Sequence, residues 1–404
     1  MVSQYFPPET GAAASRMGDL SKYLAQNGYD VTVLTEIPNY PEGKYAKGYK
    51  FGFLNHDRYG EIKVYRSFVI PTRRRNLIER VLFYGSYFLG TIFNSFRMPH
   101  TDIVLGTSPS PLTGVAAWFI SVIKGAKFVI DVRELWPESV VSRKQMKPGL
   151  ALTLLRSIEK FIYKRANLIC LAVPGFREHI DLVLQTKTDY IDLINGAPDD
   201  FFNEQYENID IEEAKDLSNK FVVFFSGNHG IAQSMETLIE AAIRLREEAD
   251  IHFLLVGNGI VKPKLKRLSK EMNLNNITFL SSKPRELMPS LIKIASVCIV
   301  PLKGIPLFKH AIPSKMFEYL ACGKPVILSV AGEASKILKD SGGGITIDPE
   351  NTDALVESIK FFKNNPEKIK EYGTRGKIYI KKNYKKSDIY QRFSKILIKL
   401  VSDL

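Results

Sequence analysis

The segment "AIPSKMFEYLACGKPVI" (residues 311–327) predicts one helix followed by one buried strand. Pro313 suits the first helical position, because its ring fixes φ and its missing N–H group would be unbonded there. Gly323 suits the position just after the helix, where a left-handed residue is common. The apolar run that starts at residue 324 then predicts a strand, so the segment is one helix–strand unit of an α/β protein.

Helix–strand units of this kind recur along the chain in two series. Strand-like apolar runs of the first series lie at residues 29–35, 102–108, 126–132, 167–173 and 190–195. Those of the second series lie at residues 220–228, 251–259, 276–282, 296–302, 324–330 and 343–348. Each series predicts a doubly wound parallel sheet, and such sheets bind ligands beyond the carboxyl ends of their strands.

The two series predict two Rossmann-like domains that face a central cleft. We expect residues 1–202 to form the first domain and residues 203–386 the second, with a final helix at 387–404 that packs back on the first. The opening run, residues 1–6, is shorter than a usual buried strand. It indicates either a short first strand or natural N-terminal residues that this sequence lacks.

The composition is that of a globular protein with excess positive charge. The chain has 404 residues, a net charge of +13 and three scattered cysteines without a CxxC pair, which indicates a reducing cytosol. No zinc-finger, RRM or KH signature accompanies the charge, so we expect no nucleic-acid partner. The sequence has neither a DxD carboxylate pair nor a His/Cys cluster with metal-ligand spacing, so we expect no metal and no other cofactor.

Lys315 lies in the opening turn of the predicted helix, where the helix dipole favours carboxylates over ammonium groups. A bound diphosphate would resolve this conflict, because helix N-termini bind phosphate through backbone N–H groups and the lysine adds a positive charge. Ser314 and Glu318 share this end of the helix, where Glu318 would accept hydrogen bonds from sugar hydroxyls. The alternative is a solvated lysine, tolerated at a cost of under about 1 kcal/mol.

The segment "PSKMFEYLACGKPVI" (313–327) resembles the donor-site motif of glycosyltransferase family 4, a retaining group with the GT-B fold. Residues 3–35, 131–139, 225–242 and 254–259 resemble further parts of that family in the same order. The resemblance implies an acceptor-binding first domain and a second domain that binds a UDP-sugar. It also implies a front-face reaction without a dedicated nucleophile, in which the leaving diphosphate helps to deprotonate the acceptor.

The most similar subgroup assembles surface polysaccharides such as O-antigen and capsule, and it includes L-fucosamine transferases. The resemblance therefore implies N-acetyl-L-fucosamine or a related amino sugar in the donor, and an undecaprenyl-diphosphate-linked saccharide as the acceptor. Two other functions stay open. One is a sugar-nucleotide epimerase with the same fold, and the other is a sugar-nucleotide-binding protein without turnover.

Some residues depart from the pattern of the family. Members often have two glutamates eight positions apart; Glu318 fits the second, and His310 stands at the first and is a catalytic candidate. Many members also have an arginine and a lysine after the first donor-domain strand, where this chain has Asn228 and Gln233. Lys315 is the candidate that replaces one of the two missing charges.

Further donor-site candidates lie in the turns that follow strands. By resemblance, Thr10 and Gly11 lie near the sugar diphosphate, and Lys283 lies near the nucleotide base. Gly227 and Gly257 belong to glycine turns whose backbone N–H groups can form an anion site. The alternatives are a helix cap at Thr10, ordinary glycine turns, and a solvated charge at Lys283.

The segment "DVRELWPES" (131–139) places charged residues just after a buried strand, where side chains commonly face a ligand. Glu134 would orient or deprotonate an acceptor hydroxyl, and Arg133 would bind an acceptor phosphate. The alternative is an internal salt bridge at the start of a helix.

Residues 73–98 join three arginines, Arg73, Arg74 and Arg75, to an uncharged apolar run at 81–96. The run is shorter than the ~20 residues that span a bilayer as a helix. One interpretation is an interfacial helix with its arginines on anionic lipid, and the other is a helix buried against the first sheet. A lipid-linked acceptor favours the first, so we expect a cytoplasmic protein bound peripherally to the inner face of the cell membrane.

Overall fold

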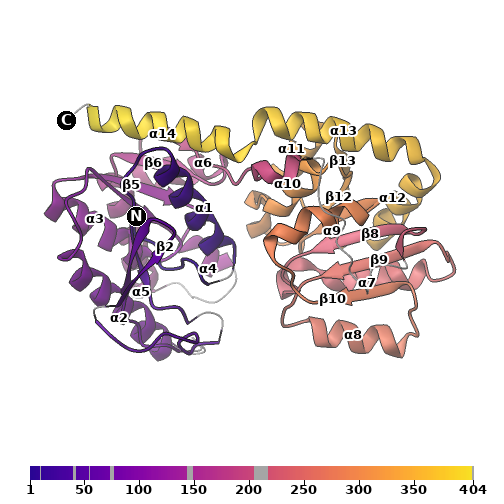
Figure 1. The fold of residues 1–404 in the computed structure, drawn as a ribbon, viewed down its shortest axis with the longest axis horizontal. Helices are drawn as coiled ribbons and strands as arrows, with labels where there is room; N and C mark the ends of the chain where they lie inside the picture. Colours follow the sequence, from indigo (N-terminus) through magenta and orange to yellow (C-terminus); the bar gives the residue numbers. More distant parts are fainter. Residues whose placement is uncertain are drawn as a thin grey trace. The chain divides into compact units, whose positions relative to one another are not determined.

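The chain folds into two compact units, each with its own sheet. The computed structural model describes residues 1–9, 11–39, 42–53, 55–72, 77–142, 149–203 and 217–402. Unit 1 comprises Met1–Ile194 together with Ile389–Leu404, and unit 2 comprises Asn195–Asp388 (Figure 1).

The first boundary lies after Ile194 rather than after residue 202, because the segment that follows Ile194 pairs within unit 2. The Ala197 N–H group donates to the Tyr384 carbonyl at 2.8 Å, and the Lys386 N–H group donates to the Ala197 carbonyl at 2.9 Å. These bonds tie the start of unit 2 to its end.

The strands of unit 1 form two groups joined by the opening residues of the chain. Val2 bridges Leu34 and Gly106 in parallel, so the opening segment is a short strand-like link between the groups. The groups have the orders β1-β3-β2 and β4-β5-β6-β7. The bounds are β1 (Thr32–Glu36), β2 (Asn55–Tyr59), β3 (Ile62–Ser67), β4 (Ile103–Thr107), β5 (Lys127–Val132), β6 (Leu168–Leu171) and β7 (Tyr190–Asp192).

Helices flank this sheet, and the last helix of the chain joins its core. The helix α14 (Lys386–Ser402; yellow in Figure 1) begins in unit 2 and enters unit 1 at Ile389. Its Tyr390 and Phe393 share one core with Leu20 and Leu24 of α1. The other bounds are α1 (Ala12–Gln26), α2 (Leu77–Ser95), α3 (Pro111–Lys124), α4 (Glu138–Ser142), α5 (Leu150–Arg165) and α6 (Phe176–Leu184).

Unit 2 has a fully parallel sheet with the strand order β10-β9-β8-β11-β12-β13. Its strands lie within the runs that the sequence predicts, and they confirm the expected α/β class. The bounds are β8 (Phe221–Ser226), β9 (Ile251–Val256), β10 (Ile277–Leu280), β11 (Val297–Pro301), β12 (Val326–Ser329) and β13 (Gly344–Thr346). The order reverses between β8 and β11, which is where open sheets of this type bind ligands.

Helices cover both faces of this sheet and bury its apolar strands. On one face, Leu238 of α7 and Phe362 of α12 pack with Phe225 and Phe253 of the sheet. This packing buries the strands and supports the residues at their carboxyl ends. The bounds are α7 (Met235–Arg244), α8 (Lys262–Glu271), α9 (Met288–Ile294), α10 (Ser314–Ala321), α11 (Glu333–Ser341), α12 (Thr352–Asn364), α13 (Pro366–Asn383), and the short 3-10 helices η1 (Asp199–Phe202), η3 (Ile231–Gln233), η4 (Arg285–Leu287) and η5 (Pro306–His310).

Candidate functional site

The helix α10 begins one residue later than the sequence predicts. Pro313 is its N-cap, with φ −63° and ψ 122°, and Ser314 is the first helical residue. The Met316 N–H group donates to the Pro313 carbonyl at 3.1 Å, whereas the Ser314 and Lys315 N–H groups have no carbonyl one turn earlier in the helix. These two N–H groups are available to an anion at the positive end of the helix.

Three contacts fix α10 against the end of β8 and against η3. Ser226, the last residue of β8, donates its N–H group to the Tyr319 hydroxyl at 2.8 Å. The Lys315 Nζ atom donates to Gln233 Oε1 at 3.2 Å and lies 4.0 Å from the centroid of the Phe225 ring. The structure thus brings Lys315 and Gln233, two of the residues that the sequence predicts for the donor site, into direct contact.

The ammonium group of Lys315 has only an amide oxygen and a ring face as close partners, and it forms no ion pair with a described residue. Burial lowers the pKa of Lys315 from 10.5 to about 7, and the field of Glu318 opposes this only in part. Burial also raises the pKa of the Glu318 carboxyl group, although nearby Lys386 and Arg285 act in the opposite direction. A phosphate group would supply the negative charge that the Lys315 ammonium group lacks.

Two glycine turns pack against each other beside Lys315, and the first of them contacts Lys315 directly. Gly227 follows β8 with φ +132°, and a Cβ atom there would lie 2.8 Å from Lys315 Nζ. Gly257 follows β9 with φ +142°, and a Cβ atom there would lie 1.8 Å from the Gly227 carbonyl oxygen. Backbones in these conformations and this close together require glycine. The predicted residues Gly227, Gly257, Gln233 and Lys315 therefore form one cluster.

His229, just after the first glycine turn, is fully buried. Neither of its ring nitrogens has a hydrogen-bond partner among the residues that the structure describes. Burial, followed by the fields of Lys262 and Lys315, lowers the pKa of His229 to about 4, so the ring is neutral at pH 7. The two ammonium groups, rather than the imidazole, carry the positive charge of this cluster.

The other predicted residues of unit 2 lie on nearby turns. Asn228 is exposed in the first glycine turn, and Lys283 is half-buried after β10. His310 is exposed at the end of η5. The catalytic role of His310 and the base contact of Lys283 stay predictions.

Some predicted residues fall outside the part of the chain that the structure describes: Thr10, Arg73, Arg74 and Arg75. Gly11, with φ +127°, is the N-cap of α1, and the placement of Thr10 near the sugar diphosphate stays a prediction. Gly11 is exposed at this turn, which follows the opening strand-like link of unit 1.

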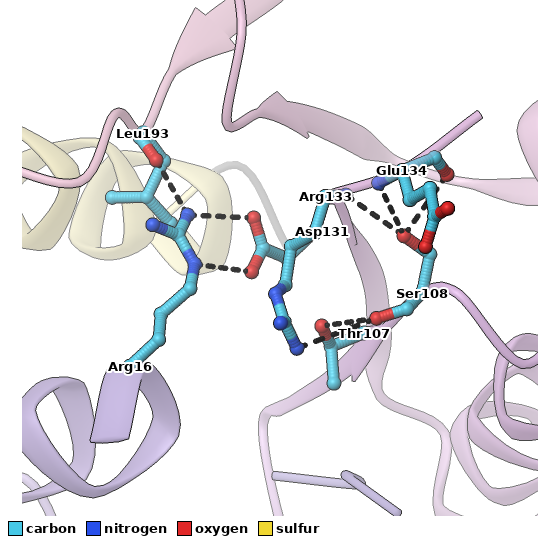
Figure 2. Close-up of polar contacts among 7 residues, drawn as sticks. All are labelled: Arg16, Thr107, Ser108, Asp131, Arg133, Glu134 and Leu193. Carbon is cyan, nitrogen blue, oxygen red and sulfur yellow. Dashed lines mark hydrogen bonds and ion pairs between the residues drawn. The ribbon is translucent and has the colours of Figure 1, made fainter. Parts of the chain in front are cut away.

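In unit 1, a buried ion pair lies at the carboxyl end of β5 (Figure 2). Arg16 of α1 donates from Nε and Nη2 to the two carboxylate oxygens of Asp131, both at 2.9 Å. Its Nη2 atom also donates to the Leu193 carbonyl at 2.5 Å. Burial alone would lower the pKa of Arg16, but the pairing with Asp131 raises it. The pair fixes α1, β5 and the end of β7 to one another.

Ser108 positions the two predicted acceptor residues beside this ion pair (Figure 2). Its hydroxyl oxygen accepts from the N–H groups of Arg133 at 2.8 Å and Glu134 at 3.2 Å. Burial lowers the pKa of Arg133 to about 10, with Asp131 acting in the opposite direction, so the guanidinium stays charged at pH 7. Asp131 forms the buried ion pair of this segment with Arg16. The Arg133 guanidinium is half-buried instead, and it donates to the Ser108 carbonyl at 3.5 Å.

Three residues of these clusters are not predicted from the sequence: Arg16, His229 and Lys262. Arg16 had a signal, because it is a charged residue among the apolar positions of α1 that face the core. His229 and Lys262 had none, because their burial results from contacts between turns of different strands. Among the described residues, no three His, Cys, Asp or Glu side chains are grouped to hold a metal ion; independence of metal stays a prediction.

Residues 207–379 match the protein family described as Glycosyl transferases group 1. These residues form a group 1 glycosyltransferase domain. The domain contains the sheet of unit 2, both glycine turns and the start of α10. The cluster around Lys315 therefore belongs to a glycosyltransferase domain.

The whole chain also resembles known glycosyltransferases. It is 23% identical over 368 residues to WcaI of Escherichia coli K12, a candidate colanic acid biosynthesis glycosyl transferase, covering 88% of this chain and 89% of that one. Sucrose-phosphate synthase of Thermosynechococcus elongatus has a TM-score of 0.70 at 18% identity, covering 100% of this chain and 96% of that one. Anabaena HepE in complex with UDP and glucose has a TM-score of 0.71 at 14% identity, covering 98% of this chain and 99% of that one. The structural likeness confirms the expected GT-B fold.

Proposed function

We propose that this protein is a retaining glycosyltransferase of family 4 that transfers a sugar from a UDP-sugar to a lipid-linked saccharide. The observation that carries the proposal is the Lys315 ammonium group, held at the start of α10 against a glycine turn without an ion-pair partner among the described residues. The UDP complex of Anabaena HepE, a protein of the same fold, supports a nucleotide-sugar donor. The name of the WcaI relative supports a role in the assembly of a surface polysaccharide such as O-antigen or capsule.

In the proposed reaction, the bond between the sugar C1 atom and the diphosphate oxygen breaks while a bond from C1 to the acceptor oxygen forms on the same face. The acceptor proton passes to the leaving diphosphate. Negative charge therefore develops on the diphosphate, and its stabilisation is the main electrostatic task of the protein. Lys315 and the free N–H groups of Ser314 and Lys315 would perform this task, so we propose that no metal ion is needed.

The acceptor in this proposal is bound by unit 1. Arg133 keeps a charged guanidinium group beside the Arg16–Asp131 pair and would bind the phosphate of the lipid carrier. Glu134, held by the Ser108 hydroxyl, would orient the acceptor hydroxyl. An undecaprenyl-diphosphate-linked saccharide fits these roles, because it offers both a phosphate and a sugar hydroxyl.

The surface of α2 supports binding at a cytoplasmic membrane face. Its inner side is buried in unit 1 through Phe83 and Tyr87, so the buried-helix interpretation holds for that side. Its outer side exposes a stripe of large apolar residues, namely Ile78, Val81, Leu82, Leu89 and Phe93. Contiguous exposed apolar patches mark contact with a membrane or a partner. Among the described residues, no helix has the length and apolarity that crossing a membrane requires, so we propose interfacial binding.

Replacing two residues of this stripe, Leu89→Glu with Phe93→Glu, is expected to reduce binding to anionic phospholipid vesicles by about tenfold or more, because two side chains lose their apolar burial. Co-sedimentation with vesicles measures the effect. Leu182→Glu on α6 is the matched control, since Leu182 is also an apolar helical residue with 78% exposure. Equal co-sedimentation of the parent and the double variant would eliminate the membrane surface proposed for α2.

The proposed function is tested by incubating the protein with UDP-sugars and an undecaprenyl-diphosphate-linked saccharide in the presence of EDTA. UDP-N-acetyl-L-fucosamine comes first in the panel because of the subgroup resemblance. The expected result is release of UDP and a product with the anomeric configuration of the donor. Inversion at a sugar carbon without an acceptor would instead identify an epimerase, and binding without turnover would identify a non-catalytic protein.

A further inference from the structure

Lys262, the first residue of α8, is a buried lysine that has only neutral acceptors. Its Nζ atom donates to the Gly257 carbonyl and the Leu280 carbonyl, both at 2.6 Å, and to Asn258 Oδ1 at 3.1 Å. The residue is 9% exposed, and it forms no ion pair with any carboxylate in the described ranges. A buried charge without a counter-charge is costly, so an anion bound nearby would stabilise it.

The position of Lys262 connects it with the cluster around Lys315. Lys262 holds the backbone of Gly257, and the Gly257 backbone lies against the Gly227 carbonyl. Gly227 in turn lies against Lys315 Nζ. His229 experiences the fields of both ammonium groups, which contribute to lowering its pKa. Two lysines without carboxylate partners among the described residues therefore act on one small region at the ends of β8 and β9.

We propose that Lys262 is a positioning residue of the nucleoside diphosphate site, where it fixes the Gly257–Gly259 turn and supplies the second positive charge. The inference rests on the proposed function, because it takes a nucleoside diphosphate as the ligand. It explains how a chain with Asn228 and Gln233 at the two family positions still presents two cations. Lys315 contributes one positive charge from α10. Lys262 contributes the other from α8, behind the glycine turn whose backbone it holds.

The test compares the binding of UDP with that of uridine, which lacks the phosphates, to the chain of 404 residues. Lys262→Gln is expected to weaken UDP binding about tenfold and to leave uridine binding unchanged, because the lost charge acts only on phosphate. Lys262→Arg, which keeps the charge, is expected to bind UDP with an affinity within about threefold of that of the parent. Lys264→Gln is the matched control, since Lys264 is an exposed lysine of the same helix that pairs with Glu236 at 3.3 Å.

Three results would overturn the inference. Lys262→Gln with parental UDP affinity would show that the charge has no effect, and equal losses for UDP and uridine would show a purely structural role. If Lys262→Gln does not fold, UDP binding by the Lys315→Met protein is measured at several salt concentrations instead. An affinity that still falls with salt supports a second cation at the site. An affinity that no longer depends on salt contradicts a second cation. A parent protein that does not bind UDP would instead refute the proposed function itself.

Discussion

Replacing Lys315 by methionine is expected to weaken UDP binding about 100-fold. Methionine keeps an unbranched apolar side chain of similar size, but it removes the ammonium group together with its contact on the Phe225 ring. Hydrogen bonds to charged groups contribute about 1.5–3 kcal/mol, and about 2.7 kcal/mol corresponds to a factor of 100. Isothermal titration calorimetry with UDP measures the change directly.

The specificity of this effect is checked with a second ligand and a second variant. Uridine is expected to bind the parent and the Lys315→Met protein equally, because it lacks the phosphates. Lys339→Met, at an exposed lysine of the neighbouring helix α11, is expected to bind UDP like the parent. Equal UDP affinity of the parent and the Lys315→Met protein would remove Lys315 from the donor site.

Raising the pH from 7 to 9 is expected to weaken UDP binding by about tenfold per pH unit. Burial lowers the pKa of Lys315 to about 7 in the free protein, so above pH 7 the ammonium group loses its proton. Bound diphosphate favours the charged form of Lys315 and raises this pKa, so binding is accompanied by proton uptake. The affinity for UDP therefore falls as the pH rises from the pKa of the free protein to that of the complex. The cost is about 1.4 kcal/mol per pH unit.

Other titrating groups are excluded by the choice of conditions and by one variant. The terminal phosphate of UDP is ionised throughout this range, because its second pKa is near 6. His229 is neutral throughout, because its pKa is lowered to about 4. Lys315→Arg keeps its charge at every pH, so its UDP affinity is expected to be constant from pH 7 to 9. The same pH dependence in Lys315→Arg would assign the effect to another group, such as Glu318 or Lys262, whose pKa is also lowered by burial.

The strands β8 and β9 were predictable from the sequence because each is a continuous apolar run. The burial of β8 and β9 follows directly from "KFVVFFSGN" (220–228) and "IHFLLVGNG" (251–259). The hairpin of β2 and β3 was not predictable in the same way. The residues of β2, "NHDRY" (55–59), are polar and alternate between half-buried and exposed positions at the edge of the sheet. Such a strand depends on its partner β3 rather than on its own composition.

The candidate site was predictable where a residue conflicts with its local structure. A lysine in the first turn of a helix conflicts with the helix dipole, and Lys315 is therefore visible in the sequence. Lys262 conflicts only with burial, which results from long-range packing. Arg16 is visible as a charged residue among the core-facing positions of α1, but its partner is not. The Arg16–Asp131 pair joins α1 to β5, and Lys262 joins the ends of β9 and β10. No local pattern records either contact.

A crystal structure of the protein with UDP tests the proposed diphosphate site most directly. We expect the phosphates to lie beside Gly227, with their oxygens about 2.7–3.2 Å from Lys315 Nζ and from the N–H groups of Ser314 and Lys315. Phosphates bound elsewhere, for example against Arg133 of unit 1, would contradict the assignment of the start of α10 as the diphosphate site.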